Sequence, residues 1–164
     1  LSAWPSDVAA GIRHHRRVDA FVDSHPAVHN ALRRAPSRGR RYAGIALDLV
    51  WDHFVAKELG LDSTQSQLVL RSYHVLGRHS APARLSRMVP ALIAQDWLHR
   101  YADYTFTCRA IDGIGQRLSG PNRLAELLPW LRHDYPRLEQ DFRQLWPDVT
   151  QALGVPPRLP PFQP

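Results

Sequence analysis

Two short polar clusters contain the residue types that hydrolytic metal sites use. In GIRHHRRVDAFVD (residues 11–23), His15, Asp19 and Asp23 follow one another at intervals of four residues. If the segment is helical, this spacing places one imidazole and two carboxylates on a single helix face. Such a mixture of nitrogen and oxygen donors suits Mn²⁺, Mg²⁺, Fe²⁺ or Zn²⁺. The segment is therefore a candidate metal-binding face.

The second cluster lies in ALDLVWDHF (46–54), where Asp48 and Asp52 are again four residues apart and His53 follows directly. Burying two acids on an apolar helix is costly unless a cation or several hydrogen-bond donors compensate. Helical bundles build metal sites from ligands on facing helices. We therefore predict a metal site formed by His15, Asp19, Asp23, Asp48, Asp52 and His53. The alternative is that these acids pair with arginines and only stabilise the fold.

The charge of the chain indicates an acidic partner. The formal net charge is +6 at pH 7, and Lys57 is the only lysine among 21 cationic residues. The segment RRAPSRGRR (33–41) contains several arginines and no acid, which predicts a basic loop. A basic surface attracts nucleic acid, anionic lipid or an acidic protein. Aromatic residues do not interleave with these arginines. We therefore interpret the segment as a solvated loop rather than as a nucleic-acid site.

Several functional classes are excluded by what the sequence lacks. It has no apolar stretch of roughly 20 residues that would span a bilayer, and no P-loop, dinucleotide fingerprint or G-x-S-x-G motif. Cys108 is the only cysteine, so an internal disulfide is excluded, which suits a reducing cytoplasm. The chain begins at Leu1 without an initiator methionine, and we expect a native N-terminal segment to be missing.

Apolar residues recur at helical spacing almost throughout, and no β-alternation stands out. The length of 164 residues fits one domain. We predict an all-α, compact single-domain helical bundle over 1–153, followed by an extended proline-rich tail over 154–164. The pattern predicts helices at about 6–23, 26–32, 42–59, 63–79, 82–101, 104–118, 122–134 and 136–153. Pro90 predicts a kink in the helix over 82–101.

The two clusters resemble those of the acyl carrier protein phosphodiesterases. The segments QDWLHRYAD (95–103), RLSGPNRLAELLPWL (117–131) and DFRQLWPDV (141–149) fit the same family, so the resemblance covers nearly the whole chain. It implies an all-helical enzyme distantly similar to HD-type metal phosphohydrolases. The implied reaction hydrolyses the phosphodiester between phosphopantetheine and a serine of holo acyl carrier protein. The implied cofactor is Mn²⁺, with Mg²⁺ and Fe²⁺ as alternatives. A short N-terminal segment typical of the family is absent from this sequence.

The resemblance also assigns roles to individual residues. The family's motifs fall on four catalytic candidates: His15, Arg16, Asp19 and Asp52. Arginine binds phosphate oxygens in a forked geometry, which suits Arg16 to the substrate phosphate. We expect an acidic carrier protein, rather than a membrane or nucleic acid, to contact Arg38, Arg40 and Arg41. Two other functions stay open: an HD-like nucleotide phosphohydrolase, and a non-catalytic basic helical module that binds an acidic partner.

Overall fold

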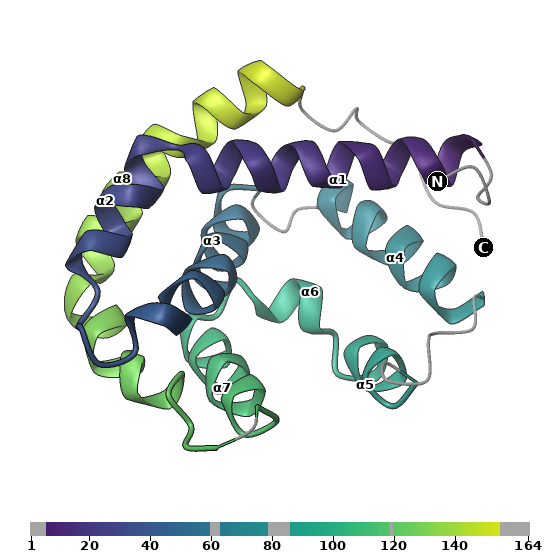
Figure 1. The fold of residues 1–164 in the computed structure, drawn as a ribbon. Helices are drawn as coiled ribbons and strands as arrows, with labels where there is room; N and C mark the ends of the chain where they lie inside the picture. Colours follow the sequence, from purple (N-terminus) through teal and green to yellow (C-terminus); the bar gives the residue numbers. More distant parts are fainter. Residues whose placement is uncertain (1–5, 60–62, 79–85, 119, 155–164) are drawn as a thin grey trace. The chain divides into compact units, whose positions relative to one another are not determined.

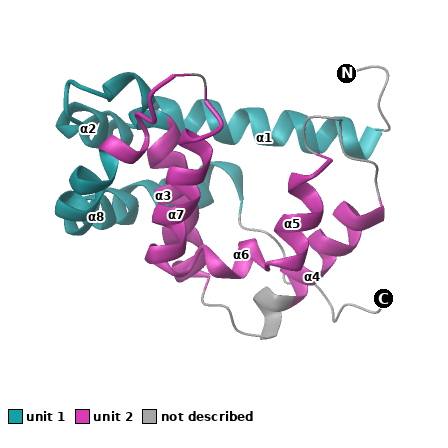
Figure 2. Cartoon of the chain, turned by 90° about the horizontal axis from the view of Figure 1, so that it is seen from below, with its two compact units in different colours: residues 1–44, 127–156 teal, residues 45–126, 157–164 magenta. Residues whose placement is uncertain are grey.

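The computed structural model describes residues 6–59, 63–78, 86–118 and 120–154, and within these ranges it contains helices and no strand (Figure 1). The all-α prediction is confirmed. The chain forms two compact units (Figure 2). The first unit comprises Leu1–Gly44 and Leu127–Pro156, and the second comprises Ile45–Glu126 and Pro157–Pro164. The predicted tail lies almost entirely outside the described residues.

The first unit is built from α1 (Ser6–Ser24), α2 (Pro26–Arg34) and α8 (Leu128–Leu153), with a short 3₁₀ turn η1 (Arg40–Tyr42). Pro26 occupies the first turn of α2, where its missing N–H costs nothing. The His25 Nδ1 atom accepts a hydrogen bond from the Ala27 N–H at 3.2 Å and caps this helix. α2 packs against α8, and α1 contacts both. The first two predicted helices are therefore correct within a few residues.

The last helix differs from the prediction. We expected a break at Tyr135, with helices over 122–134 and 136–153, but α8 is one helix that runs through Pro136 and Pro147. Proline in a helix interior removes one backbone hydrogen bond. Here Asp134, Leu138 and Asp141 are buried on both sides of Pro136. Packing of this face against α2 keeps the helix continuous despite the proline.

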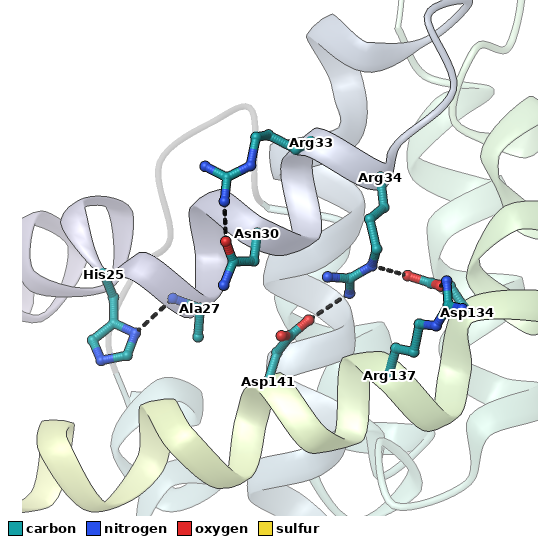
Figure 3. A network of polar contacts seen from close by, with 8 residues as sticks. All are labelled: His25, Ala27, Asn30, Arg33, Arg34, Asp134, Arg137 and Asp141. Carbon is teal, nitrogen blue, oxygen red and sulfur yellow. Dashed lines mark hydrogen bonds and ion pairs between the residues drawn. The ribbon is translucent and has the colours of Figure 1, made fainter.

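Arg34 joins α2 to α8 through two buried carboxylates (Figure 3). Its Nε atom donates to Asp134 Oδ2 at 2.6 Å, and its Nη2 atom donates to Asp141 Oδ2. Asp134 is only 3% exposed and Asp141 only 7% exposed. A second cation, Arg137, lies 3.6 Å from the other oxygen of Asp134. Because the two acids are two helical turns apart, one guanidinium sets the position of α2 along α8.

The second unit contains the helices α4 (Ser63–Arg78), α5 (Met88–Ala94), α6 (Trp97–Arg100) and α7 (Tyr104–Gly115). It also contains α3 (Ala43–Glu58) from Ile45 onward and the 3₁₀ turn η3 (Ala125–Leu127) up to Glu126. The helices α4, α5 and α6 pack against one another. The Phe106 ring of α7 meets the Trp97 and Tyr101 rings edge to face at 6.0 and 5.5 Å. These contacts attach α7 to the segment around α6.

The helix predicted over 82–101 is wrong. Residues 82–85 lie outside the described part of the chain, and the rest forms two helices, α5 and α6, separated by Gln95 and Asp96. Asp96 has a φ of 52°, which ends the first helix. Pro90 is the third residue of α5, where a backbone N–H has no partner within the helix. Pro90 therefore removes no hydrogen bond from the helix, and the predicted kink is wrong.

We predict that Arg34→Ala lowers the free energy of unfolding by about 3–5 kcal/mol, because it leaves two buried carboxylates without their cation. Chemical denaturation measures this change. Arg33→Ala is the matched control: Arg33 is exposed and donates to Asn30 on the same helix, so the expected loss is below about 0.5 kcal/mol. Equal losses in the two variants would contradict the role of the Arg34 network.

Candidate functional site

The α1 cluster lies on an exposed helix face. His15 Nδ1 is 3.0 Å from Asp19 Oδ2, and the two side chains are 76% and 57% exposed. The four-residue spacing in one helix produces this pair. Asp23, one turn further along, is also exposed. The structure thus brings His15 and Asp19 together and orients one nitrogen of the imidazole.

Arginines occupy the neighbouring part of α1. Arg13, Arg16 and Arg17, with Ala10, line a depression in the surface of the first unit. All three arginine residues are exposed. Among the residues that the structure describes, its lining has three guanidinium groups and no carboxylate, which suits the depression to an anion.

The α3 cluster divides between two environments. Asp48 and Asp52 are exposed, whereas His53 is only 1% exposed. The His53 Nδ1–H donates to the Tyr101 carbonyl oxygen at 2.8 Å, and the ring lies 5.3 Å from the Tyr104 ring. A side chain that follows directly along a helix points about 100° away from its predecessor. His53 therefore attaches α3 to the segment after α6, while the two acids face elsewhere.

Asp52 lines a pocket of about 230 Å³ within the second unit. The pocket is formed by α3, α4 and the region of α6. Its apolar walls consist of Val55, Ala56, Leu59, Leu68, Val69 and Leu98. Of the described residues, Asp52, Ser72 and Tyr101 add polar groups to the lining. An apolar lining with a few polar groups is typical of a small-molecule subsite.

The pocket changes the acidity of Asp52. Although the residue keeps exposed surface, the surrounding protein limits hydration of its carboxylate, and this desolvation is the main cause that raises its pKa to about 6. The nearby charge of Asp48 raises the pKa further. Burial, with a smaller contribution from Asp52, also raises the pKa of Tyr101. Asp52 can therefore exchange a proton close to neutral pH, as a general base or acid must.

Polar contacts hold the pocket walls in place. The Tyr73 hydroxyl accepts a hydrogen bond from the Leu98 N–H and donates to Asp96 Oδ1, both at 2.9 Å. His99 Nδ1 donates to the same Asp96 oxygen at 2.7 Å. The Tyr101 carbonyl accepts from Thr107 Oγ1 at 3.2 Å in addition to His53. These contacts fix the backbone of Leu98 and Tyr101, and they hold Asp96 in its left-handed conformation.

The sequence pattern indicates Asp52 but not the pocket around it. The lining combines residues of the consecutive helices α3 and α4 with Leu98 and Tyr101, which lie much later in the sequence, so no local spacing reveals it. The usable signal was the segment QDWLHRYAD, which contains both Leu98 and Tyr101. Its two lining residues follow the helical spacing i, i+3 and so share one helix face.

The predicted metal ligands fall into separate groups. His15, Asp19 and Asp23 belong to the first unit, whereas Asp48, Asp52 and His53 belong to the second. Among the residues that the structure describes, no group of three or more His, Cys, Asp or Glu side chains is suited to hold a metal ion. Neither cluster by itself fits a divalent cation with a full ligand set. The six-residue metal site stays a prediction.

Comparison with known proteins places the chain in a family. The family model for acyl carrier protein phosphodiesterase matches residues 1–149. This chain belongs to that family. A curated acyl carrier protein phosphodiesterase of Photorhabdus laumondii is 30% identical over 153 residues, covering 90% of this chain and 77% of the relative. One of Escherichia coli is 32% identical over 150 residues, covering 88% and 78%.

Family membership confirms the resemblance stated from the sequence. No solved structure matches the chain significantly, so the distant similarity to HD-type hydrolases stays a prediction. Within the described part of the chain, no helix is long and apolar enough to cross a membrane. The domain boundaries predicted at 153 and 154 also stay a prediction.

We predict that the Asp52 carboxyl titrates with a midpoint near pH 6 in the folded protein, and that Asp48→Asn lowers this midpoint. Removing the Asp48 charge removes one of the two causes of the raised pKa. Desolvation remains, so the midpoint should stay above 3.8, the ordinary value of an aspartate. Carbon-13 NMR of the side-chain carboxyl carbons measures it.

Stability provides an independent check of the same shift. Because the folded state binds the Asp52 proton more tightly than the unfolded state, ionising Asp52 opposes folding. This unfavourable contribution grows as the pH rises from about 4 to about 6, and is fully present above that range. Asp52→Asn should therefore raise Tm at pH 7.5 and change it little at pH 4. A lower Tm at pH 7.5 would contradict the raised pKa.

Proposed function

We propose that this chain hydrolyses the phosphodiester that joins phosphopantetheine to a serine of holo acyl carrier protein. The products are apo carrier protein and free phosphopantetheine. The observation that carries the proposal is the family match over residues 1–149, a range that contains both polar clusters and the pocket. The curated relatives bear the name of this activity.

The reaction requires a proton to move from water to the leaving serine. Water attacks phosphorus, the bond between phosphorus and the serine oxygen breaks, and that oxygen takes up a proton. We assign Asp52 as the base that receives the proton of the attacking water. A carboxylate with a pKa of about 6 is ionised at neutral pH and is a stronger base than an ordinary aspartate. Activity should accordingly rise with pH through about 6.

The residues of α1 receive separate roles in this proposal. The exposed guanidinium of Arg16 binds the non-bridging phosphate oxygens, since two of its N–H groups can donate in parallel. His15 is oriented by Asp19 at 3.0 Å, and its imidazole serves the reacting water or a bound cation. Both roles are supported by the motif correspondence and by the exposure of these side chains.

Metal dependence is a further part of the proposal, with Mn²⁺ as the first choice and Mg²⁺ or Fe²⁺ as alternatives. The support is the donor chemistry of the predicted ligand residues and the family resemblance. A bound divalent cation supplies charge neutralisation at the phosphoryl oxygen and lowers the pKa of coordinated water. Metal content after dialysis, measured by inductively coupled plasma mass spectrometry, tests it.

The proposed partner is the acidic carrier protein rather than nucleic acid, and the proposed location is the cytoplasm. Arg38, Arg40 and Arg41 are exposed in the first unit. Arg40 also donates to the Ala35 carbonyl at 3.0 Å, and the Arg41 guanidinium lies 5.3 Å from the Tyr42 ring centre. Such a preordered basic loop suits a negatively charged partner. The single Cys108, which is buried and unpaired, suits a reducing compartment.

We predict that the protein incubated with holo acyl carrier protein and Mn²⁺ converts it to the apo form, as measured by intact mass. Asp52→Asn should lower kcat by about 100-fold or more, the usual contribution of a general base. The control is Asp112→Asn, a substitution outside the pocket in the same unit. An unchanged carrier mass with cleavage of nucleotides instead would favour the rival phosphohydrolase. An unchanged mass with carrier binding would favour a non-catalytic module.

We predict that Arg16→Lys lowers kcat/KM by about tenfold or more while Tm and metal content stay unchanged. Lysine keeps the charge but loses the forked pair of donors that matches a phosphate. Arg33→Lys is the control, because Arg33 is an exposed arginine of the same unit that does not line this depression. If both variants keep normal kinetics, Arg16 is not the phosphate ligand.

A further inference from the structure

We propose that the pocket beside Asp52 binds the branched end of the phosphopantetheine arm, which carries two methyl groups next to the phosphate. This inference rests on the proposed function. It assigns a substrate subsite to the cavity of about 230 Å³ between α3, α4 and α6. The subsite would hold the part of the substrate that does not react.

The chemistry of the lining points to a compact apolar group. Val55, Ala56, Val69 and Leu98 present methyl groups from three helices. In the arm, the phosphate ester oxygen is followed by a methylene and then by a carbon bearing two methyl groups. This carbon is the apolar branch point of an otherwise amide-rich chain. Moving its methyl groups from water into an apolar cavity is favourable.

The position of Asp52 selects this segment over the rest of the arm. A group that accepts the proton of the attacking water must lie close to the phosphorus atom. The dimethyl carbon is the apolar part of the arm nearest to that atom. The thiol, or an acyl chain attached to it, lies at the opposite end of the arm. With the phosphorus atom beside Asp52, the dimethyl segment is therefore the apolar part of the arm that lies nearest to this cavity.

Polar atoms in the lining match the hydroxyl that follows the branch point. Ser72 Oγ donates to the Leu68 carbonyl at 2.9 Å, so its oxygen remains suited to accept a hydrogen bond. The Asp52 carboxylate is an acceptor as well. One apolar surface with a few oriented acceptors is the arrangement that fixes a small ligand in a single pose.

The walls are also fixed before any ligand arrives. The Tyr73 hydroxyl holds the backbone of Leu98, and His53 holds the backbone of Tyr101 at 2.8 Å. Asp96 is kept at a positive φ by Tyr73 and His99, and such backbone strain persists only where the surroundings enforce it. A pre-formed cavity binds its ligand without a further loss of conformational entropy in its walls.

The test compares holo carrier protein with a carrier whose arm lacks the two methyl groups. We expect the normal protein to lose about tenfold in kcat/KM with the altered arm. Ala56→Leu fills the pocket, so it should lose about as much with the natural arm and little more with the altered arm. Ala94→Leu, on an exposed residue of α5, is the matched control and should behave like the unmodified protein.

A binding measurement separates this inference from the proposed function. Saturation-transfer NMR with free pantetheine should show the strongest transfer to the two methyl groups, and Ala56→Leu should abolish it. If Ala56→Leu fails to fold, Val69→Ala, which removes wall contacts, should weaken the transfer instead.

Equal kcat/KM for both arms, or methyl transfer that Ala56→Leu leaves unchanged, would overturn the subsite. So would a loss in Ala56→Leu that appears only with acylated carrier, which would assign the pocket to the acyl chain. Failure of the unmodified protein to cleave holo carrier would instead overturn the proposed function, while pantetheine binding could still be measured.

Discussion

The ionic contact of Arg34 with Asp134 and Asp141 is the constraint on which the first unit depends. Two carboxylates that are 3% and 7% exposed remain tolerable only because one guanidinium donates to both. The same contact determines which face of α8 packs against α2. Packing of this face keeps α8 helical at Pro136. The basic loop predicted over 33–41 starts later in the structure, because Arg33 and Arg34 form the end of α2. The anchored end of α2 therefore also fixes where the loop starts.

In the second unit, side-chain hydrogen bonds hold the backbone around α6 in place. Around α6 the chain turns sharply at Asp96, and the Tyr73 hydroxyl satisfies both a backbone N–H and the Asp96 carboxylate. On the buried side of α3, His53 donates a hydrogen bond to the Tyr101 carbonyl. Hydrogen bonds to buried backbone groups are directional. They therefore set the positions of Leu98 and Tyr101, and with them the shape of the pocket.

Asp52 illustrates the conflict between stability and function. A carboxylate beside apolar walls and near a second acid would be replaced if stability alone mattered, because its ionisation opposes folding. A raised pKa next to a pocket is typical of functional sites. His53, its neighbour in the sequence, has the opposite role: it is buried and stabilises the fold. Adjacent residues of one motif thus serve different purposes because they face different environments.

The helical class, the family and the residues capable of acid–base or ligand chemistry can be read from the sequence alone. Helical spacing and capping are local, so α1, α2 and α3 follow from their own residues, and the pairing of His15 with Asp19 follows from a four-residue interval. The folded structure alone reveals that α8 continues past Pro136, that the helix breaks at Asp96, and that a pocket lies beside Asp52. Each of these depends on residues distant in the sequence, whose packing and desolvation no local pattern contains.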